Sequence, residues 1–195
     1  MKEIFFFSNN KNKIIEISKI FLLTSYKLLS LNDFEKTISP KETGGSFEEN
    51  ANIKSSFSFN KFKKISFADD SGICIEAMSN KPGVNSKEFL SSEKDKLKVF
   101  EKIISIVKSN NNFKAYFQTT ICLTLSKHNH VFFNGKIDGR ISKKILGKNG
   151  FGYDPIFIPT GEKQTLGQMS VIKKNQLSHR SIALKKLINY LSKIN

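Results

Sequence analysis

Residues 4–21 read IFFFSNNKNKIIEISKIF, and the spacing of the apolar residues changes across the polar loop Ser8 to Asn12. The run at 4–7 is short and continuous, which is typical of a buried strand. Between 14 and 21 the isoleucines and a phenylalanine recur at helical spacing. A further apolar stretch at 28–31 completes a predicted strand–helix–strand unit, which favours an α/β fold.

The rest of the chain continues this mixture of helices and strands. Ser46, with Glu49 three residues later, has the spacing of a capping box and predicts a helix that runs to about Phe62. Periodicity further predicts a helix over 97–107, two long strands over 113–125 and 131–141 in an antiparallel middle, and a last helix with Ser178 as its N-cap.

The chain has 195 residues, of which 38% are hydrophobic, enough for one domain or for two lobes around a cleft. The apolar run near the N-terminus is too short for a signal peptide, and no stretch approaches the length of a membrane span. Cys74 and Cys122 have no metal-ligand spacing, as expected of a reduced, intracellular setting. We therefore expect a cytoplasmic protein.

The net charge of +15 raises the question of a nucleic-acid partner. The lysines are scattered through every segment, and no aromatic RNA-binding signature, zinc-finger spacing or dense arginine run accompanies them. A biased composition therefore explains the charge, and no specific nucleic-acid site is expected.

Residues 67–72, FADDSG, place two aspartates between two predicted strand segments. Ile65 and Phe67 upstream, and Ile73, Ile75 and Ala77 downstream, alternate with other residues as in half-buried strands. Successive strand side chains point to opposite faces, so Asp69 and Asp70 should diverge unless the backbone bulges. Carboxylates at this position suit a hard cation such as Mg²⁺, although one of the two could instead bond backbone N–H groups at a turn.

Three further segments carry groups that could bind a nucleotide. The loop SNNKNK (8–13) precedes a predicted helix, where backbone N–H groups favour a phosphate, with Lys13 as a point charge. In GKNGFGYDPIFIP (147–159), a phenylalanine lies between two glycines and could expose its ring to a flat ligand. His179 and Arg180 stand in the first turn of the last helix, where cations oppose the helix dipole, which favours a functional role.

Taken together and in this order, the motifs resemble the inosine triphosphate pyrophosphatase family, also called XTP/dITP diphosphatases, from residue 4 to about residue 191. The motifs are SNNKNK, ETGGSFEENANIKS, FADDSG, PGV, FNGKIDGRI, GFGYDPIF and MSVIKKNQLSHRSIAL. The resemblance implies an α/β fold with an elongated mixed β-sheet, flanking helices and two lobes around a central active-site cleft, in a homodimer. It also implies a single catalytic domain that hydrolyses nonstandard purine nucleoside triphosphates (ITP, dITP, XTP) to the monophosphate and pyrophosphate with Mg²⁺.

The resemblance also implies roles for individual residues. Glu42 and Asp70 would hold Mg²⁺, Asp70 would accept the proton of the attacking water, and Asp69 would support them. The phosphates and sugar would be contacted by Ser8, Asn9, Asn10, Lys11, Asn12, Lys13, Lys54 and Ser71, and the nucleotide and its base by Phe151, Gly152, Tyr153, Asp154, Lys174, His179 and Arg180.

Two departures from the family pattern stand out. Lys41 replaces a second acid that commonly precedes Glu42, and Lys87-Glu88-Phe89 replaces a small residue, an arginine and an aromatic after PGVNS. Two alternatives stay open: a related pyrophosphatase that acts on pyrimidine or other modified nucleotides, and a basic nucleic-acid-binding protein on this fold.

Overall fold

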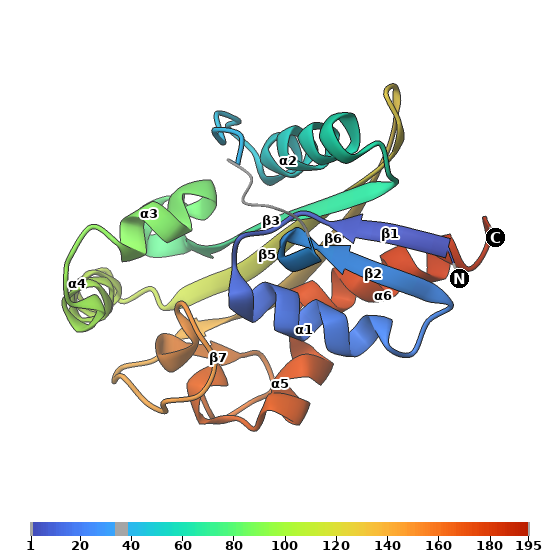
Figure 1. The fold of residues 1–195 in the computed structure, drawn as a ribbon. Coiled ribbons are helices and arrows are strands. Elements are labelled where there is room, and N and C mark those ends of the chain that lie inside the picture. Colours follow the sequence, from blue (N-terminus) through green and yellow to red (C-terminus); the bar gives the residue numbers. More distant parts are fainter. Residues whose placement is uncertain (1, 34–38, 195) are drawn as a thin grey trace. The chain divides into compact units, whose positions relative to one another are not determined.

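The computed structural model describes residues 2–33 and 39–194 (Figure 1). These residues form two compact units. The first unit comprises the described residues up to Asp70, Thr119–Asn134, and the described residues from Ala183 onward. The second comprises Ser71–Gln118 and Gly135–Ile182, so the chain passes from one unit to the other directly after Asp70.

The first unit begins with the predicted strand–helix–strand unit. Strand β1 (Lys2–Phe6) pairs in parallel with β2 (Tyr26–Ser30), and helix α1 (Lys11–Phe21) connects them. The helix begins where it does because the side chain of Asn10 accepts hydrogen bonds from the backbone N–H groups of residues 12 and 13.

Successive side chains of a strand point to opposite faces, so the phenylalanines at positions 5–7 belong to two small cores. Ile4 and Phe6 pack in a cluster with residues of α1 and of α6 (His179–Leu191), whereas Phe5 and Phe7 pack with residues of α2 (Phe47–Phe62). Figure 1 shows the same division, with α1 and α6 on one side of β1 and α2 on the other. Both faces of β1 are therefore covered, as its continuous apolar run predicts.

The second unit has its own hydrophobic core. Val99, Ile103 and Val107 lie on one face of helix α4 (Lys96–Ser109) and pack in a cluster with Ile73 and Ile75 of strand β3 (Ser66–Ile75). Deletion of such fully buried side chains typically costs a few kcal/mol each, so this cluster fixes the second half of β3.

The remaining elements are β4 (Lys81–Pro82), α3 (Ser86–Leu90), β5 (Lys114–Ser126), β6 (Asn129–Ile141), β7 (Phe157–Pro159) and α5 (Val171–Leu177). The strands are hydrogen-bonded in the order β2-β1-β3-β5-β6-β7, with β4 paired to β3. Strand β1 pairs in parallel with β2 and β3, whereas β3–β4 and β6–β7 are antiparallel, so the predicted mixed sheet of an α/β fold is confirmed.

Two local predictions need correction. Strand β3 is one continuous strand, and nearly all of its residues are buried, so its alternating sequence does not mark a half-buried strand. The expected capping box is only half formed: the hydroxyl of Ser46 accepts from the Glu49 N–H, but the Glu49 carboxylate accepts from the N–H of Gly45. The cap of the last helix is as predicted, because the Ser178 hydroxyl accepts from the Ser181 N–H.

Candidate active site

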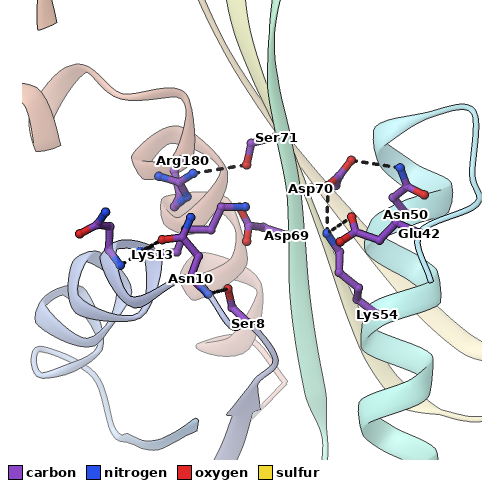
Figure 2. A network of polar contacts seen from close by, with 11 residues as sticks. Ser8, Asn10, Lys13, Glu42, Asn50, Lys54, Asp69, Asp70, Ser71 and Arg180 are labelled. Atoms are coloured by element: carbon purple, nitrogen blue, oxygen red, sulfur yellow. Dashed lines mark hydrogen bonds and ion pairs between the residues drawn. The ribbon is translucent and has the colours of Figure 1, made fainter. Parts of the chain in front are cut away.

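Strand β3 presents its two aspartates to opposite sides, because they are neighbours in a continuous strand. Figure 2 shows Asp69 directed toward α1 and Asp70 directed toward α2. Both side chains belong to buried residues, which are 2% and 6% exposed. Each buried carboxylate therefore needs its own partners.

On the α1 side, the carboxylate of Asp69 pairs with the ammonium group of Lys13 at 2.8 Å. Lys13 stands in the first turn of α1, where a lysine has no favourable interaction with the helix dipole. Asp69 is thus bonded to Lys13, the cation predicted to meet the substrate phosphates, and its supporting role stays a prediction.

The rest of the loop before α1 is held by its own polar side chains. The hydroxyl of Ser8 accepts from the Asn10 N–H at 3.2 Å, and the Asn9 amide donates to the hydroxyl of Ser39. Lys11 and Asn12 are exposed in the first turn. The loop therefore has a defined shape and leaves polar groups at its surface.

On the α2 side, one ammonium group serves two carboxylates. Lys54 Nζ lies 2.9 Å from Asp70 Oδ1 and 2.7 Å from Glu42 Oε2. Asp70 and Glu42 are 28 positions apart in the sequence, and Lys54 of α2 bonds both of them.

The titration of these groups reflects burial opposed by charge. Burial raises the pKa of Asp70 to about 6, although the charge and hydrogen bond of Lys54 oppose that shift. At Glu42 burial also favours the neutral form, but the charge and hydrogen bond of Lys54 outweigh it and hold the pKa below its usual value. Burial favours the neutral form of Lys54 too, yet the surrounding carboxylates raise its pKa.

Asn50 is a further residue of this cluster that the predicted site does not contain. It lies on α2 one turn before Lys54, and its side-chain amide donates to Asp70 Oδ2 at 3.4 Å. Its position four residues from Lys54, on the same helix face, is the signal in the sequence that could have included it.

In the second unit, Ser71 and Arg180 lie together. The Arg180 guanidinium donates to the hydroxyl of Ser71 at 3.3 Å, as Figure 2 shows, and Arg180 is only 2% exposed. Arg180 is the second residue of α6, as predicted. Beside it, the ring of His179 stacks on Phe117 with ring centroids 4.8 Å apart.

The GFGYDP segment of the second unit is organised by Asp154. Its Oδ2 accepts from the Phe151 N–H at 2.7 Å and from the Lys174 ammonium at 2.5 Å. Gly150 is required here, because it has a φ of +77° and an added Cβ would lie 2.0 Å from that oxygen.

Two cations lie against the aromatic ring of this segment. Lys174 Nζ is 4.4 Å and the Arg180 guanidinium carbon 5.6 Å from the centroid of Phe151. By contrast Tyr153 is buried in the core of the second unit, where its hydroxyl donates to the Ser86 carbonyl at 2.6 Å. Gly152 has a φ of +65° with open space where a Cβ would point.

Glu42 and Asp70 are residues that could hold Mg²⁺, because both offer hard carboxylate oxygens and both lie against the same ammonium group of Lys54. Within residues 2–33 and 39–194, no three His, Cys, Asp or Glu side chains are grouped so that they could hold a metal ion. Mg²⁺ commonly uses one or two carboxylates and completes its shell with substrate phosphates and water, so two donors suffice.

In the described parts of the chain, no helix is both long enough and apolar enough to span a membrane.

Comparison with known proteins agrees with the motif resemblance. A dITP/XTP pyrophosphatase of Christiangramia forsetii is 37% identical over 188 residues, which cover 96% of this chain and 98% of that protein. A dITP/XTP pyrophosphatase of Leptospira interrogans is 38% identical over 190 residues, 94% of each chain.

Solved structures are also similar over nearly the whole chain. A HAM1 protein from Coxiella burnetii has a TM-score of 0.90 at 29% identity and covers 99% of this chain and all of its own. The Staphylococcus aureus Ham1 protein has a TM-score of 0.88 at 32% identity, with full coverage of both chains. The model of the Ham1 family matches residues 4–190, and the chain therefore belongs to the Ham1 family.

Proposed function

We propose that this protein hydrolyses dITP, XTP and ITP to the nucleoside monophosphate and pyrophosphate, and so removes nonstandard purine nucleotides from the nucleotide pool. The observation that carries the proposal is the cluster on the α2 side of β3, where Asp70 and Glu42 share Lys54. Relatives that match nearly all of the chain are named dITP/XTP pyrophosphatase, which supports the same reaction.

Hydrolysis of a triphosphate needs charge neutralisation and positioning more than covalent chemistry. Lys13 and Lys54 supply positive charge for the phosphates. Glu42 and Asp70 would hold Mg²⁺, which neutralises charge on the phosphate oxygens when it is bound.

Asp70 is the proposed proton acceptor for the attacking water. A buried carboxylate whose pKa is raised to about 6 is ionised at pH 7 and is a better base than an exposed aspartate. Its orientation is set by Lys54 at one oxygen, so the proton would be taken up by a carboxylate in a fixed position.

The second unit carries the groups proposed to recognise the base. Hypoxanthine and xanthine have a keto oxygen at C6, which can accept from donors such as His179 and Arg180, whereas adenine presents an amino group there. A site that hydrogen-bonds its substrate can discriminate by up to about 10⁴-fold, because the wrong base leaves buried donors unpaired. The ring of Phe151 would stack on either base.

Pyrophosphate release from ITP, XTP, ATP and dUTP, with Mg²⁺ and with EDTA, tests the proposal. We expect inosine monophosphate and pyrophosphate from ITP with Mg²⁺, little turnover of ATP or dUTP, and none with EDTA. Preference for dUTP would favour the pyrimidine alternative. Release of inorganic phosphate and the diphosphate, or no turnover of any nucleotide, would contradict the proposed reaction.

The substitution Arg180→Ala tests whether Arg180 recognises the base of the nucleotide. The substitution should reduce kcat/KM for ITP and XTP more than for ATP and so narrow the ratio of ITP to ATP. Arg140→Ala, which removes an exposed arginine, is the matched control and should leave that ratio unchanged. An unchanged ratio in Arg180→Ala would show that this guanidinium does not read the base.

The proposal includes a homodimer in the cytoplasm and no specific binding of nucleic acid. The excess positive charge predicts only salt-sensitive binding to DNA, since counterion release governs non-specific contacts. Sedimentation equilibrium checks the dimer, and DNA binding measured from low to physiological salt checks the charge. Sequence-selective, nanomolar binding at physiological salt would contradict the enzyme-only function.

A further inference from the structure

Asn50 adds a second connection between the two parts of the proposed metal-binding cluster, Glu42 and Asp70, that Lys54 also joins. It lies in the first half of α2, is 4% exposed, and stands one turn before Lys54. Besides its bond to Asp70, its Oδ1 accepts from the backbone N–H of Gly44 at 2.8 Å. Gly44 is two residues after Glu42. The side-chain amide of Asn50 therefore contacts both the Asp70 carboxylate and the segment that carries Glu42.

The orientation of this amide is determined by its two partners. The backbone N–H of Gly44 can only donate, and an ionised Asp70 can only accept. Only one orientation of the amide therefore satisfies both bonds, and neither an aspartate nor a leucine in place of Asn50 could make them both.

The segment before α2 that contains Glu42 and Gly44, here called the Glu42 loop, lies close to Asn50. A Cβ added to Gly44 would lie 2.8 Å from the Asn50 Oδ1 and 2.5 Å from the Glu49 Cβ. A side chain at position 44 would thus push the loop away from α2, which makes the contact with Asn50 a specific feature of this loop.

The bond to Asp70 completes the positioning of that carboxylate. Lys54 donates to Oδ1 and Asn50 to Oδ2, so each oxygen has a separate donor and rotation of the carboxylate is restricted. We propose that Asn50 is a positioning residue that holds the Glu42 loop and the Asp70 carboxylate in the positions that binding of Mg²⁺ requires. This inference rests on the proposed function only for its effect on turnover.

Two substitutions separate the two bonds. Asn50→Leu removes both, whereas Asn50→Asp has nearly the same shape and retains an oxygen for the Gly44 N–H but has no amide donor for Asp70. Asn52→Leu is the matched control, because Asn52 lies on the same helix and its side chain instead contacts Ser56 and Cys122.

Amide hydrogen exchange in the metal-free, nucleotide-free protein gives the first readout. We expect the Gly44 amide to exchange at least about 10-fold faster in Asn50→Leu, as loss of one hydrogen bond predicts, and near the wild-type rate in Asn50→Asp. Amides in the interior of α2, such as those of Ser55 and Ser58, should be unaffected in both and would show that the helix is folded. Gly44 exchange in Asn50→Leu equal to that in Asn52→Leu would overturn the proposal.

Turnover of ITP at varied Mg²⁺ gives the second readout. Both Asn50 variants should lose about 10- to 100-fold in kcat, the range expected for loss of a hydrogen bond to a charged group, while Asn52→Leu should stay within about 3-fold of wild type. In Asn50→Leu, where the Glu42 loop is also released, the Mg²⁺ concentration for half-maximal rate should rise as well. Retention of wild-type kcat in both Asn50 variants would overturn the positioning role.

The two readouts keep this inference separate from the proposed function. If the wild-type protein did not hydrolyse ITP, the proposed function would fail, while the exchange of Gly44 would still report whether Asn50 holds the loop. If Asn50→Leu did not fold, Asn50→Asp would still test the bond to Asp70.

Discussion

Each face of strand β3 carries one buried aspartate, and the two aspartates have different partners. On the α1 face, Asp69 is paired with Lys13 at 2.8 Å. On the α2 face, Asp70 shares Lys54 with Glu42, so two carboxylates meet one ammonium group. The group on the α2 face therefore has one more negative charge than positive, whereas the pair on the α1 face is balanced. This difference in charge favours binding of a cation on the α2 face and a supporting role for Asp69 on the α1 face.

The largest expected effect comes from Asp70→Asn, which keeps the shape of the side chain but removes the proton acceptor and a metal ligand. We expect kcat for ITP to fall by about 10³-fold or more, toward the upper end of what loss of a general base costs. Binding of ITP, measured by calorimetry, should persist in part because both lysines remain. An active Asp70→Asn protein would contradict the assignment of the α2 face.

A smaller effect is expected from Lys13→Ala on the α1 face. Because Lys13 is proposed to meet charge and not the base, KM for ITP should rise by about 10- to 100-fold, while binding of inosine should change little. Lys19→Ala, an exposed lysine in the last turn of the same helix, is the control. Equal weakening of ITP and inosine would show that Lys13 does not act through the phosphates.

The pH dependence of Asp70 gives a third test. Its pKa is raised to about 6, chiefly by burial, so the basic form is lost as the pH falls through 6. The rate should then fall about tenfold for each further pH unit, and higher Mg²⁺ should move the fall to lower pH because the cation competes with the proton. An NMR titration of the metal-free protein should show a carboxyl group with a midpoint near 6 that is absent from Asp70→Asn.

The sequence predicts those parts of the molecule that depend on local spacing. The divergence of Asp69 and Asp70 follows from the period of a strand, and the start of α6 at His179 follows from the cap at Ser178. The α/β class follows from the strand–helix–strand unit near the N-terminus.

The features that sequence spacing does not predict depend on contacts between distant segments. The burial of β3 on both faces results from cores formed with other helices and strands, to which Phe67, Ile73 and Ile75 contribute from one face and Ala68 from the other, and not from its own alternating sequence. The pairing of Lys13 with Asp69, and the bond that the Asn50 amide donates to Asp70, likewise depend on how α1 and α2 pack beside β3. The roles of Glu42 and Asp70 are implied by family resemblance and stay predictions, and the structure adds that both carboxylates bond the ammonium group of Lys54.

The most direct test of the difference between the two faces is kcat for pyrophosphate release from saturating ITP in Asp69→Asn, measured beside Asp70→Asn. Loss of the buried charge of Asp69 should lower the melting temperature, because Lys13 loses its ionised partner. At a temperature well below melting, we expect a kcat within about 10-fold of wild type for Asp69→Asn and about 10³-fold or more below it for Asp70→Asn. A well-folded Asp69→Asn protein as inactive as Asp70→Asn, or the reverse order of the two, would contradict the proposed difference between the two faces.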